Sequence, residues 1–272
     1  MSRALSDFES LFGHKRALVG MIHAGAMPGT VHAREPIGAI VERAVAEARI
    51  YRDAGYTALL VENMHDRPYM KGEVGPEVVA GMTAVVREVR RAVDLPLGVQ
   101  VLAAANREAL AVALCAGAEF VRVEAFAFAH VADEGLLEAC AGPLLRYRRS
   151  IGAEHVRVYA DIKKKHSSHA ITADVSLAET AHAAEFFSAD GVIVTGTATG
   201  APALPGDVDE VAEACALPVF VGSGITPDNL VQYARARGYI VGSYVKEGGA
   251  WQNPLDPARV AALARAFEEL PR

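Results

Sequence analysis

The 272-residue sequence predicts an α/β protein in which eight parallel strands close into a (β/α)8 TIM barrel. Eight short runs rich in β-branched residues alternate with longer, alanine-rich segments that have helical spacing. This alternation favours a parallel sheet, and eight repeats favour a closed barrel over an open sheet. Because no linker rich in proline, glycine and serine divides the chain, we expect residues 1–272 to form one barrel domain with a lead-in over residues 1–15.

The expected strands are short and bounded by turn residues. They cover residues 17–23, 58–63, 97–101, 120–124, 156–163, 191–195, 219–223 and 239–243.

The expected helices carry apolar residues three and four positions apart. Residues 130–150 contain Gly142-Pro143, which predicts two helical pieces there rather than one. The other expected helices cover residues 37–54, 77–93, 106–116, 176–188, 208–216, 227–236 and 257–270.

Composition and charge exclude several classes of protein. Hydrophobic residues make up 51% of the chain and charged residues 22%, which excludes a disordered chain. No apolar run approaches the roughly 20 residues needed to span a bilayer, and the first residues lack an apolar signal core. The formal net charge of −6 gives no attraction to nucleic acid or to anionic membranes. We therefore expect a cytoplasmic protein without a nucleic-acid partner, without membrane insertion and with free, buried cysteines.

Strand parity predicts which polar side chains enter the barrel mouth, because successive side chains on a strand face opposite ways. In the fifth strand, Asp161 and Lys163 lie opposite the apolar set and are expected to point inward. The parity of the second strand is undecided between Glu62 and Asn63. The expected mouth residues are His23, Glu62 or Asn63, Gln100, Glu124, Asp161, Lys163, Thr195, Ser223 and Ser243.

This group of side chains suits acid–base chemistry, and the alternative is a plug of paired polar groups. In a plug, Arg122 would pair with Glu124 and Asp161 with Lys163. We favour a site, because so many ionisable groups are a costly way to fill space. Lys163 is expected to take part in catalysis, whereas the two lysines after it are expected to lie in solvent. The candidate catalytic residues are Asp161, Lys163, Glu124, His23 and Asn63.

Two glycine-rich turns after the seventh and eighth strands predict a phosphate site. Glycine lets the backbone present its N–H groups to a ligand, and a helix N-terminus attracts an anion. Thr226-Pro227 predicts such a helix start. The stretch 195–200 is expected to form a mobile loop that closes on the ligand. The candidate ligand-binding residues are Gly222, Ser223, Gly224, Gly242, Ser243, Lys246, Thr195, Gly196, Thr197 and Gln100.

A divalent metal ion is an open alternative at the same mouth. Glu62, Glu124 and Asp161 would supply its carboxylate oxygens. The histidines form no H-x-H or H-E-x-x-H pattern, so they do not indicate a metal site. The sequence specifies no cofactor.

Several motifs occur together along nearly the whole chain: 19–23 (VGMIH), 27–29 (MPG), 61–63 (VEN) with Asp66 and Pro68, 98–102 (GVQVL), 160–166 (ADIKKKH), 194–200 (VTGTATG), 222–226 (GSGIT) and 240–243 (IVGS). In this combination the chain resembles the BtpA/SgcQ family of membrane-complex and photosystem I biogenesis proteins. The resemblance implies a TIM-like barrel similar to the ribulose-phosphate-binding barrels. Residues 103–106 (AAAN) depart from the Arg-Asn-Asp of some members, so a substrate contact made there does not carry over.

The sequence supports an enzyme that binds a small phosphorylated metabolite, of the sugar-phosphate or phosphoribosyl type, at the carboxyl-terminal barrel face. Lyase, isomerase and glycosyl-cleavage chemistry all fit the acid–base residues. The resemblance implies an alternative, a non-catalytic biogenesis or stability factor for a larger membrane complex. A sensor that binds the metabolite without turnover is a third hypothesis, and a homo-oligomer is open because the alanine-rich helices leave small apolar faces.

Overall fold

A computed structural model of the chain describes residues 2–271 and confirms the TIM barrel; Met1 and Arg272 lie outside the described residues. The barrel strands are β1 (Ala17–His23), β2 (Ala58–Glu62), β3 (Leu97–Gln100), β4 (Phe120–Val123), β7 (Arg157–Ile162), β9 (Gly191–Thr195), β10 (Val219–Gly222) and β11 (Gly238–Val241). They close in the order β1-β11-β10-β9-β7-β4-β3-β2, and every neighbouring pair is parallel.

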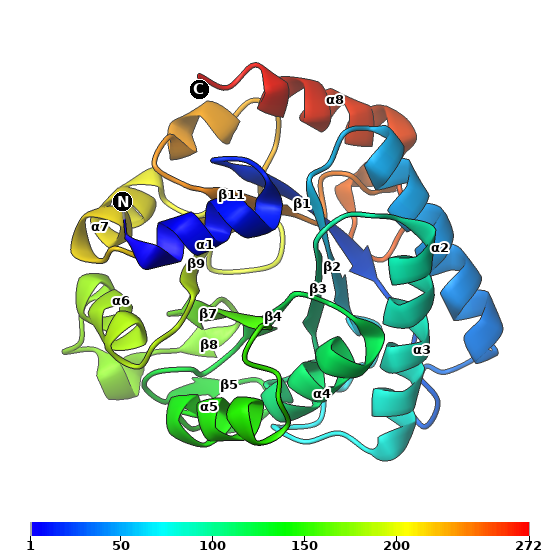
Figure 1. Cartoon of the computed structure of the whole chain (residues 1–272), viewed down its shortest axis with the longest axis horizontal. Coiled ribbons are helices and arrows are strands. Elements are labelled where there is room, and N and C mark those ends of the chain that lie inside the picture. The colour runs from blue at the N-terminus through cyan, green and yellow to red at the C-terminus, as the bar shows by residue number, and fades with distance from the viewer. Residues whose placement is uncertain (1, 272) are drawn as a thin grey trace.

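All helices except α1 (Arg3–Phe12) lie around the outside of this barrel (Figure 1). The outer helices are α2 (Ile37–Asp53), α3 (Pro76–Ala92), α4 (Asn106–Ala116), α5 (Ala141–Ser150), α6 (Leu177–Phe186), α7 (Pro205–Ala214) and α8 (Pro257–Glu268). Three short 3-10 turns, η1 (Ala170–Thr172), η2 (Leu230–Tyr233) and η3 (Glu247–Gly249), lie in the loops.

The expectation of two helical pieces in residues 130–150 is wrong for the first piece. That segment forms an antiparallel hairpin of β5 (His130–Ala132) and β6 (Gly135–Leu137), and β8 (Ser167–Ser168) pairs with β5. Burial along β5 alternates with a period of two, as in a strand. Gly142-Pro143 lies in the first turn of α5, where a missing N–H disturbs no helical hydrogen bond.

The expected helix over residues 227–236 is also wrong, because only the 3-10 turn η2 forms there. Asn229 explains the difference. Its side-chain oxygen accepts from the amide of Thr226, and its side-chain nitrogen donates to the carbonyl of Gly224. An asparagine side chain that bonds to the neighbouring backbone in this way favours a turn over a helix. No α-helix N-terminus therefore follows β10.

The lead-in contains a helix that the sequence analysis missed. In Figure 1, α1 crosses the near end of the barrel, where its Phe8 and Phe12 close the interior. The Phe12 ring lies 5.8 Å from Phe120, 6.2 Å from Tyr159 and 6.0 Å from Phe220, measured between centroids. This aromatic cluster fills the amino-terminal end of the barrel, so any ligand site has to lie at the carboxyl-terminal end.

Side-chain alternation resolves the second strand. Leu60 belongs to the apolar cluster inside the barrel, so Glu62, two residues later, faces inward as well. The ladder pairs His23 with Glu62 and Glu62 with Gln100, so these three polar side chains lie at one level of the mouth.

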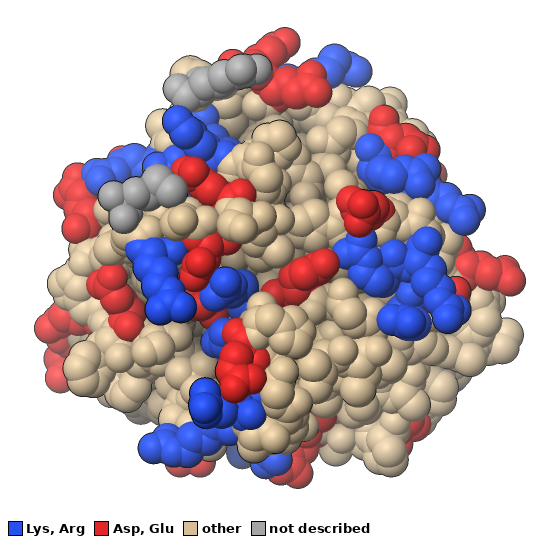
Figure 2. Space-filling view, viewed as in Figure 1, with Lys and Arg blue, Asp and Glu red and all other residues tan. Residues whose placement is uncertain are grey.

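The outer surface carries interspersed charges. Figure 2 shows basic and acidic side chains mixed over much of the face that carries α1, with one group of adjoining basic side chains at the right of the view. All three cysteines are free, but Cys115 is exposed, contrary to the expectation of buried thiols. None of the helices within residues 2–271 is both long and apolar enough to cross a membrane.

Truncating the α1 plug should destabilise the barrel. Phe12→Ala removes a ring that is 4% exposed, and we expect it to lower the free energy of unfolding by about 3–5 kcal/mol, as other buried Phe-to-Ala changes do. Urea denaturation followed by tryptophan fluorescence measures this. Phe186, which is 82% exposed at the end of α6, is the matched control. An effect of Phe12→Ala no larger than that of Phe186→Ala would show that α1 does not stabilise the barrel.

Candidate functional site

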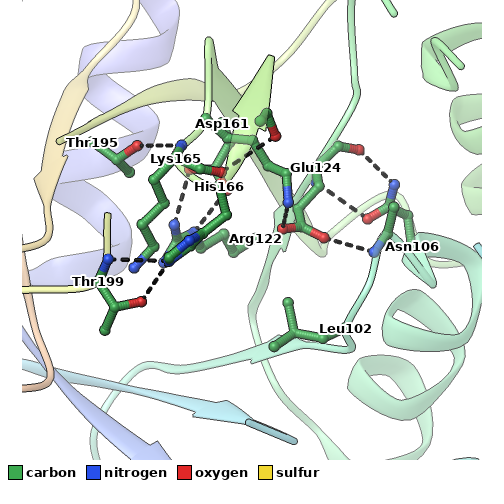
Figure 3. Close-up of polar contacts among 12 residues, drawn as sticks. Leu102, Asn106, Arg122, Glu124, Asp161, Lys165, His166, Thr195 and Thr199 are labelled. Carbon is green, nitrogen blue, oxygen red and sulfur yellow. Dashed lines mark hydrogen bonds and ion pairs between the residues drawn. The ribbon is translucent and has the colours of Figure 1, made fainter. Parts of the chain in front are cut away.

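A cavity of about 310 Å³ opens at the carboxyl-terminal ends of the strands; we call it the mouth cavity. Its walls combine strand-end side chains with loop residues such as Met64, Tyr69 and Trp251. Figure 3 shows the polar groups at its centre. Six of the ionisable or amide side chains that line it are Glu62, Gln100, Arg122, Glu124, Asp161 and Lys165.

A buried, two-point ion pair forms the floor of the mouth cavity. Arg122 from β4 donates through Nε and one terminal nitrogen to the two oxygens of Asp161 from β7, at 3.0 Å each. Both side chains are almost fully buried. Sequence parity placed both groups inward, and the two pairings of the plug alternative, Arg122 with Glu124 and Asp161 with Lys163, do not form. Asp161 is thus fully engaged by a fixed cation.

A second buried pair joins β4 to the loop after β7. Lys164 donates to Glu124 Oε1 at 2.8 Å, and the amide of Ala104 donates to Oε2 at 2.7 Å. Burial opposes ionisation, but Lys164 and these hydrogen bonds hold the pKa of Glu124 below its usual range. The expectation that Lys164 is solvated is wrong, since its side chain is buried against a carboxylate.

Glu62 is the carboxyl group at the strand ends of the mouth cavity that no lysine or arginine holds, whereas Glu124 and Asp161 are both paired. Glu62 is 6% exposed, and its carboxyl group makes no hydrogen bond within residues 2–271; His23 Nε2 lies 3.8 Å from Oε2. Burial raises its pKa, although the neighbouring Arg122 and Lys165 oppose the shift. A buried carboxyl with a raised pKa holds its proton more tightly than an exposed one and can serve as a general acid.

Two other polar groups in the mouth cavity also lack partners among residues 2–271. Gln100 is 2% exposed, and its side-chain oxygen has no hydrogen-bond donor. The amine of Lys165 makes no hydrogen bond, although its backbone amide donates to Thr195 Oγ1 at 3.1 Å. Burial, followed by the charge of Arg122, lowers the pKa of Lys165. Buried polar groups are normally paired, so these atoms are available to a ligand.

His23 lies beside Glu62 and is neutral. Its Nδ1 donates to the carbonyl of Trp251 at 3.2 Å, because a carbonyl can only accept, and its Nε2 then faces Glu62 Oε2 at 3.8 Å. Burial and the charge of Lys246 lower the pKa of His23 to about 3. The imidazole therefore presents an unprotonated nitrogen to the mouth.

Lys163 and Asn63 are not brought to the mouth cavity. Lys163 has a positive φ of 43°, so the chain turns there, and its amine donates to the carbonyl of Thr172 at 3.4 Å. Asn63 bonds to the carboxylate of Asp66 and to the amide of Leu102. These contacts hold loops together on the outer side of the strands.

The glycine turns line a smaller cavity beside the mouth cavity. This glycine cavity, of about 40 Å³, is bounded by Ser223, Gly242 and Ser243, and it shares Glu62, Arg122 and Lys165 with the mouth cavity. Within the described chain, the amides of Ser223, Gly224, Gly242 and Ser243 donate to no protein acceptor. Such amides are suited to an anion.

The loop after β9 lies over the turn after β10. Ser223 Oγ donates to the carbonyl of Ala198, and a Cβ on Gly224 would come within 2.3 Å of the Pro202 nitrogen. Thr199 and Gly200 line the glycine cavity, whereas the expected residues Thr195, Gly196 and Thr197 do not. The amide of Thr199 donates to His166 Nε2 at 3.1 Å, which ties this loop to the loop after β7.

Lys246 is also placed elsewhere. Its amine donates to both oxygens of Glu47 in α2, at 2.8 and 2.9 Å, in a separate cavity of about 300 Å³. The turn after β11 carries the side chain outward, between the barrel and α2. Lys246 therefore reaches neither the mouth cavity nor the glycine cavity.

No group of three or more histidine, cysteine, aspartate or glutamate residues within residues 2–271 is arranged to hold a metal ion. Of the three carboxylates proposed as metal ligands, Asp161 and Glu124 are held by Arg122 and Lys164, and only Glu62 is unengaged.

Sequence reasoning missed several lining residues that come from loops. Lys165, Trp251 and the hairpin tip at Asp133 and Glu134 all line the mouth cavity. Their positions depend on loop paths, for which strand parity gives no signal. The inward direction of Glu62 was predictable, because a strand that presents Leu60 to the interior also presents Glu62 there.

Comparison with known proteins agrees with this fold. Photosystem I biogenesis protein BtpA of Synechocystis is 36% identical over 265 residues, which cover 97% of this chain and 92% of the relative. A Caenorhabditis elegans protein described as mitochondrial is 45% identical over 268 residues, which cover 96% of this chain and 97% of the relative.

Two solved structures share the barrel. Thiamine phosphate pyrophosphorylase from Pyrococcus furiosus is similar with a TM-score of 0.55 at 18% identity, covering 94% of this chain and 96% of that chain. N-(5'-phosphoribosyl)anthranilate isomerase from the same organism is similar with a TM-score of 0.56 at 15% identity. The match covers 94% of this chain and 100% of the isomerase chain. At such low identity these similarities establish the fold alone.

The sequence pattern of the BtpA family matches residues 14–269, which is nearly the whole chain. Together with the similarity to the Synechocystis protein along most of its length, this match shows that the chain belongs to the BtpA family.

Proposed function

We propose that this protein is an enzyme that binds a small phosphorylated metabolite and transfers protons to or from it. The main evidence is a cluster of polar groups that lack hydrogen-bond partners within residues 2–271. The side chains of Glu62, Gln100 and Lys165 lie in the mouth cavity, and the turns beside the adjoining glycine cavity have unpaired backbone amides. Native proteins rarely leave such groups buried without partners, so their clustering supports a ligand site.

The phosphate would lie against the amides of Ser223, Gly242 and Ser243. Gly242 is the residue there without a side chain, and a Cβ at this position would come within 3.3 Å of the His23 ring, which also lines the glycine cavity. Because no α-helix begins after β10, the amides and the nearby guanidinium group of Arg122 would supply the attraction, without a helix dipole.

The rest of the metabolite would extend into the mouth cavity, where Glu62 would act as general acid or base. Asp161 and Glu124 would position Arg122 and Lys164 rather than exchange protons themselves, since both carboxylates are fully hydrogen-bonded. His23 would accept a hydrogen bond from a substrate hydroxyl through Nε2. Lyase, isomerase and glycosyl-cleavage reactions all need such a group.

A biogenesis factor is the second candidate, and the name of the Synechocystis relative favours it. Exposed Phe186 and Phe187 beside α5 offer an apolar surface to a partner. A factor without a ligand would gain nothing from unpaired groups in the mouth, so this hypothesis leaves Glu62, Gln100 and Lys165 unexplained. The cytoplasmic location stays a prediction, as one relative is described as mitochondrial.

Phosphate binding should depend on the space at Gly242. Gly242→Ala places a methyl group at the floor of the glycine cavity, and we expect it to weaken binding of phosphorylated sugars by about tenfold or more, or roughly 1.4 kcal/mol. Thermal-shift titrations with a panel of sugar phosphates and inorganic phosphate measure this affinity. Gly206→Ala in α7, where a Cβ meets nothing within 4 Å, is the control. If no compound stabilises the wild-type protein at millimolar concentration, the phosphate site is refuted.

Proton transfer should depend on Glu62. Incubation of the same panel in D₂O, followed by proton NMR, detects exchange at substrate carbons, and we expect Glu62→Gln to slow it by about 10²–10⁴-fold. Glu213→Gln, at an exposed position on α7, should leave the rate unchanged. Binding without exchange, bond cleavage or rearrangement in the wild-type protein would favour the sensor over the enzyme.

His23 should make the barrel less stable in acid. Its pKa is 6.5 when unfolded and about 3 when folded, so between these values the unfolded state binds one more proton and stability falls as the pH falls. Between pH 7 and about pH 5 the loss amounts to about 2 kcal/mol. Urea denaturation of the wild type and of His23→Asn at both pH values measures this loss. The contributions of the carboxylates to the pH dependence are common to both proteins and cancel in the comparison. The exposed control His155→Asn should keep the wild-type pH dependence; an equal dependence in His23→Asn would contradict a neutral, buried imidazole.

A further inference from the structure

We propose that Lys165 is a nucleophile that forms an imine with the carbonyl group of a phosphorylated aldehyde or ketone. This inference rests on the proposed phosphate site and narrows its substrate class. It concerns a residue that the sequence analysis expected to be solvated.

The position of Lys165 carries the proposal. Lys165 and Glu62 both line the mouth cavity and the glycine cavity, so the amine and the carboxyl group border the space next to the proposed phosphate site. Positive φ angles at Lys163 and His166 bend the segment between them back over the barrel. The amide of Lys165 donates to Thr195 Oγ1, which anchors the backbone while the amine remains without a partner among the described residues (Figure 3).

The neighbouring lysines do not share these properties. The amine of Lys164 is bound to Glu124, and that of Lys163 contacts the carbonyl of Thr172. Lys246 is bound to both oxygens of Glu47 in another cavity. Lys165 is therefore the lysine of the described chain that combines a half-buried position in the proposed site with an unengaged amine.

An imine requires an uncharged amine, and the surroundings favour one. Burial and the adjacent Arg122 guanidinium lower the pKa of Lys165, which increases the fraction of neutral amine at neutral pH. Arg122 itself stays charged, because Asp161 holds it at two points.

Glu62 completes the chemistry. The Lys165 nitrogen attacks the carbonyl carbon, a C–N bond forms, and one amine proton moves to the carbonyl oxygen to give a carbinolamine. The C–O bond then breaks as the oxygen takes a proton from the Glu62 carboxylic acid and leaves as water. The products are a protonated imine, one water molecule and the Glu62 carboxylate. That carboxylate could then remove a proton from the adjacent carbon, since the imine withdraws electrons from it.

Reductive trapping tests this step. The wild-type protein is incubated with glyceraldehyde 3-phosphate or pyridoxal 5'-phosphate and cyanoborohydride, and the modified lysine is located by peptide mass spectrometry. We expect Lys165 to be modified at least about tenfold faster than exposed Lys71, because the site orients the aldehyde. Glyceraldehyde and pyridoxal, which lack the phosphate, should show little preference for Lys165, and inorganic phosphate should slow the reaction.

Lys165→Met and Lys165→Arg should abolish this adduct. Lys165→Arg keeps the positive charge, and thermal shift with inorganic phosphate checks that it still folds and binds the anion. If inorganic phosphate stabilises the wild-type protein but neither aldehyde gives an adduct at its Lys165, the imine proposal is overturned and the phosphate site stays intact. An adduct at Lys165 that forms equally with and without the phosphate group would instead support the nucleophile and contradict the phosphate site.

Discussion

The pairing of charges at the barrel mouth determines which groups can do chemistry. Arg122 and Lys164 each hold one carboxylate, Asp161 and Glu124, by direct hydrogen bonds in a buried environment. Separating such a pair leaves an uncompensated buried charge and typically costs about 3–5 kcal/mol, so both pairs are fixed parts of the structure. Glu62 and Lys165 remain, and burial shifts both toward their neutral forms. Opposed shifts of this kind give one group that can donate a proton and another that can attack carbon.

The fold confines this chemistry to one end of the barrel. Phe8 and Phe12 of α1 fill the amino-terminal end, so the polar interior residues gather above an apolar floor. The loop after β9 covers the turn after β10 and is tied to the loop after β7 through Thr199 and His166. Both loops line the site, so binding in the glycine cavity and the position of Lys165 are physically linked. A ligand that contacts the amides at Ser243 therefore also meets Lys165 and Glu62.

Regular structure could be predicted from the sequence, but the paths of the loops could not. The eight strands followed from β-branched runs, and parity placed Arg122, Glu124 and Asp161 inward because the period of a strand is fixed. Parity also predicted that Lys163 points inward, and this was wrong. The backbone of Lys163 is left-handed, so the strand alternation ends there, and Lys165 lines the mouth cavity instead. The hairpin at β5 and β6 differs from the helix expected there, since strands of three residues are too short to distinguish a strand from a helix by the spacing of apolar residues in the sequence.

Pairing among the inward groups was likewise beyond the sequence. Arg122 can reach either Glu124 on its own strand or Asp161 on the next, and only the packing of the loop that carries Lys164 decides between them. Ser223, Gly242 and Ser243 of the glycine turns line the cavity beside the mouth, but the anchoring helix expected after Thr226 does not form because Asn229 bonds back to that turn.

The most direct test is to locate a phosphate ion in a crystal of the protein grown or soaked with inorganic phosphate. The account predicts electron density in the glycine cavity, within hydrogen-bond distance of the amides of Gly242 and Ser243 and next to Lys165. Density only at surface lysines, or amides of these turns directed away from the cavity, would contradict it.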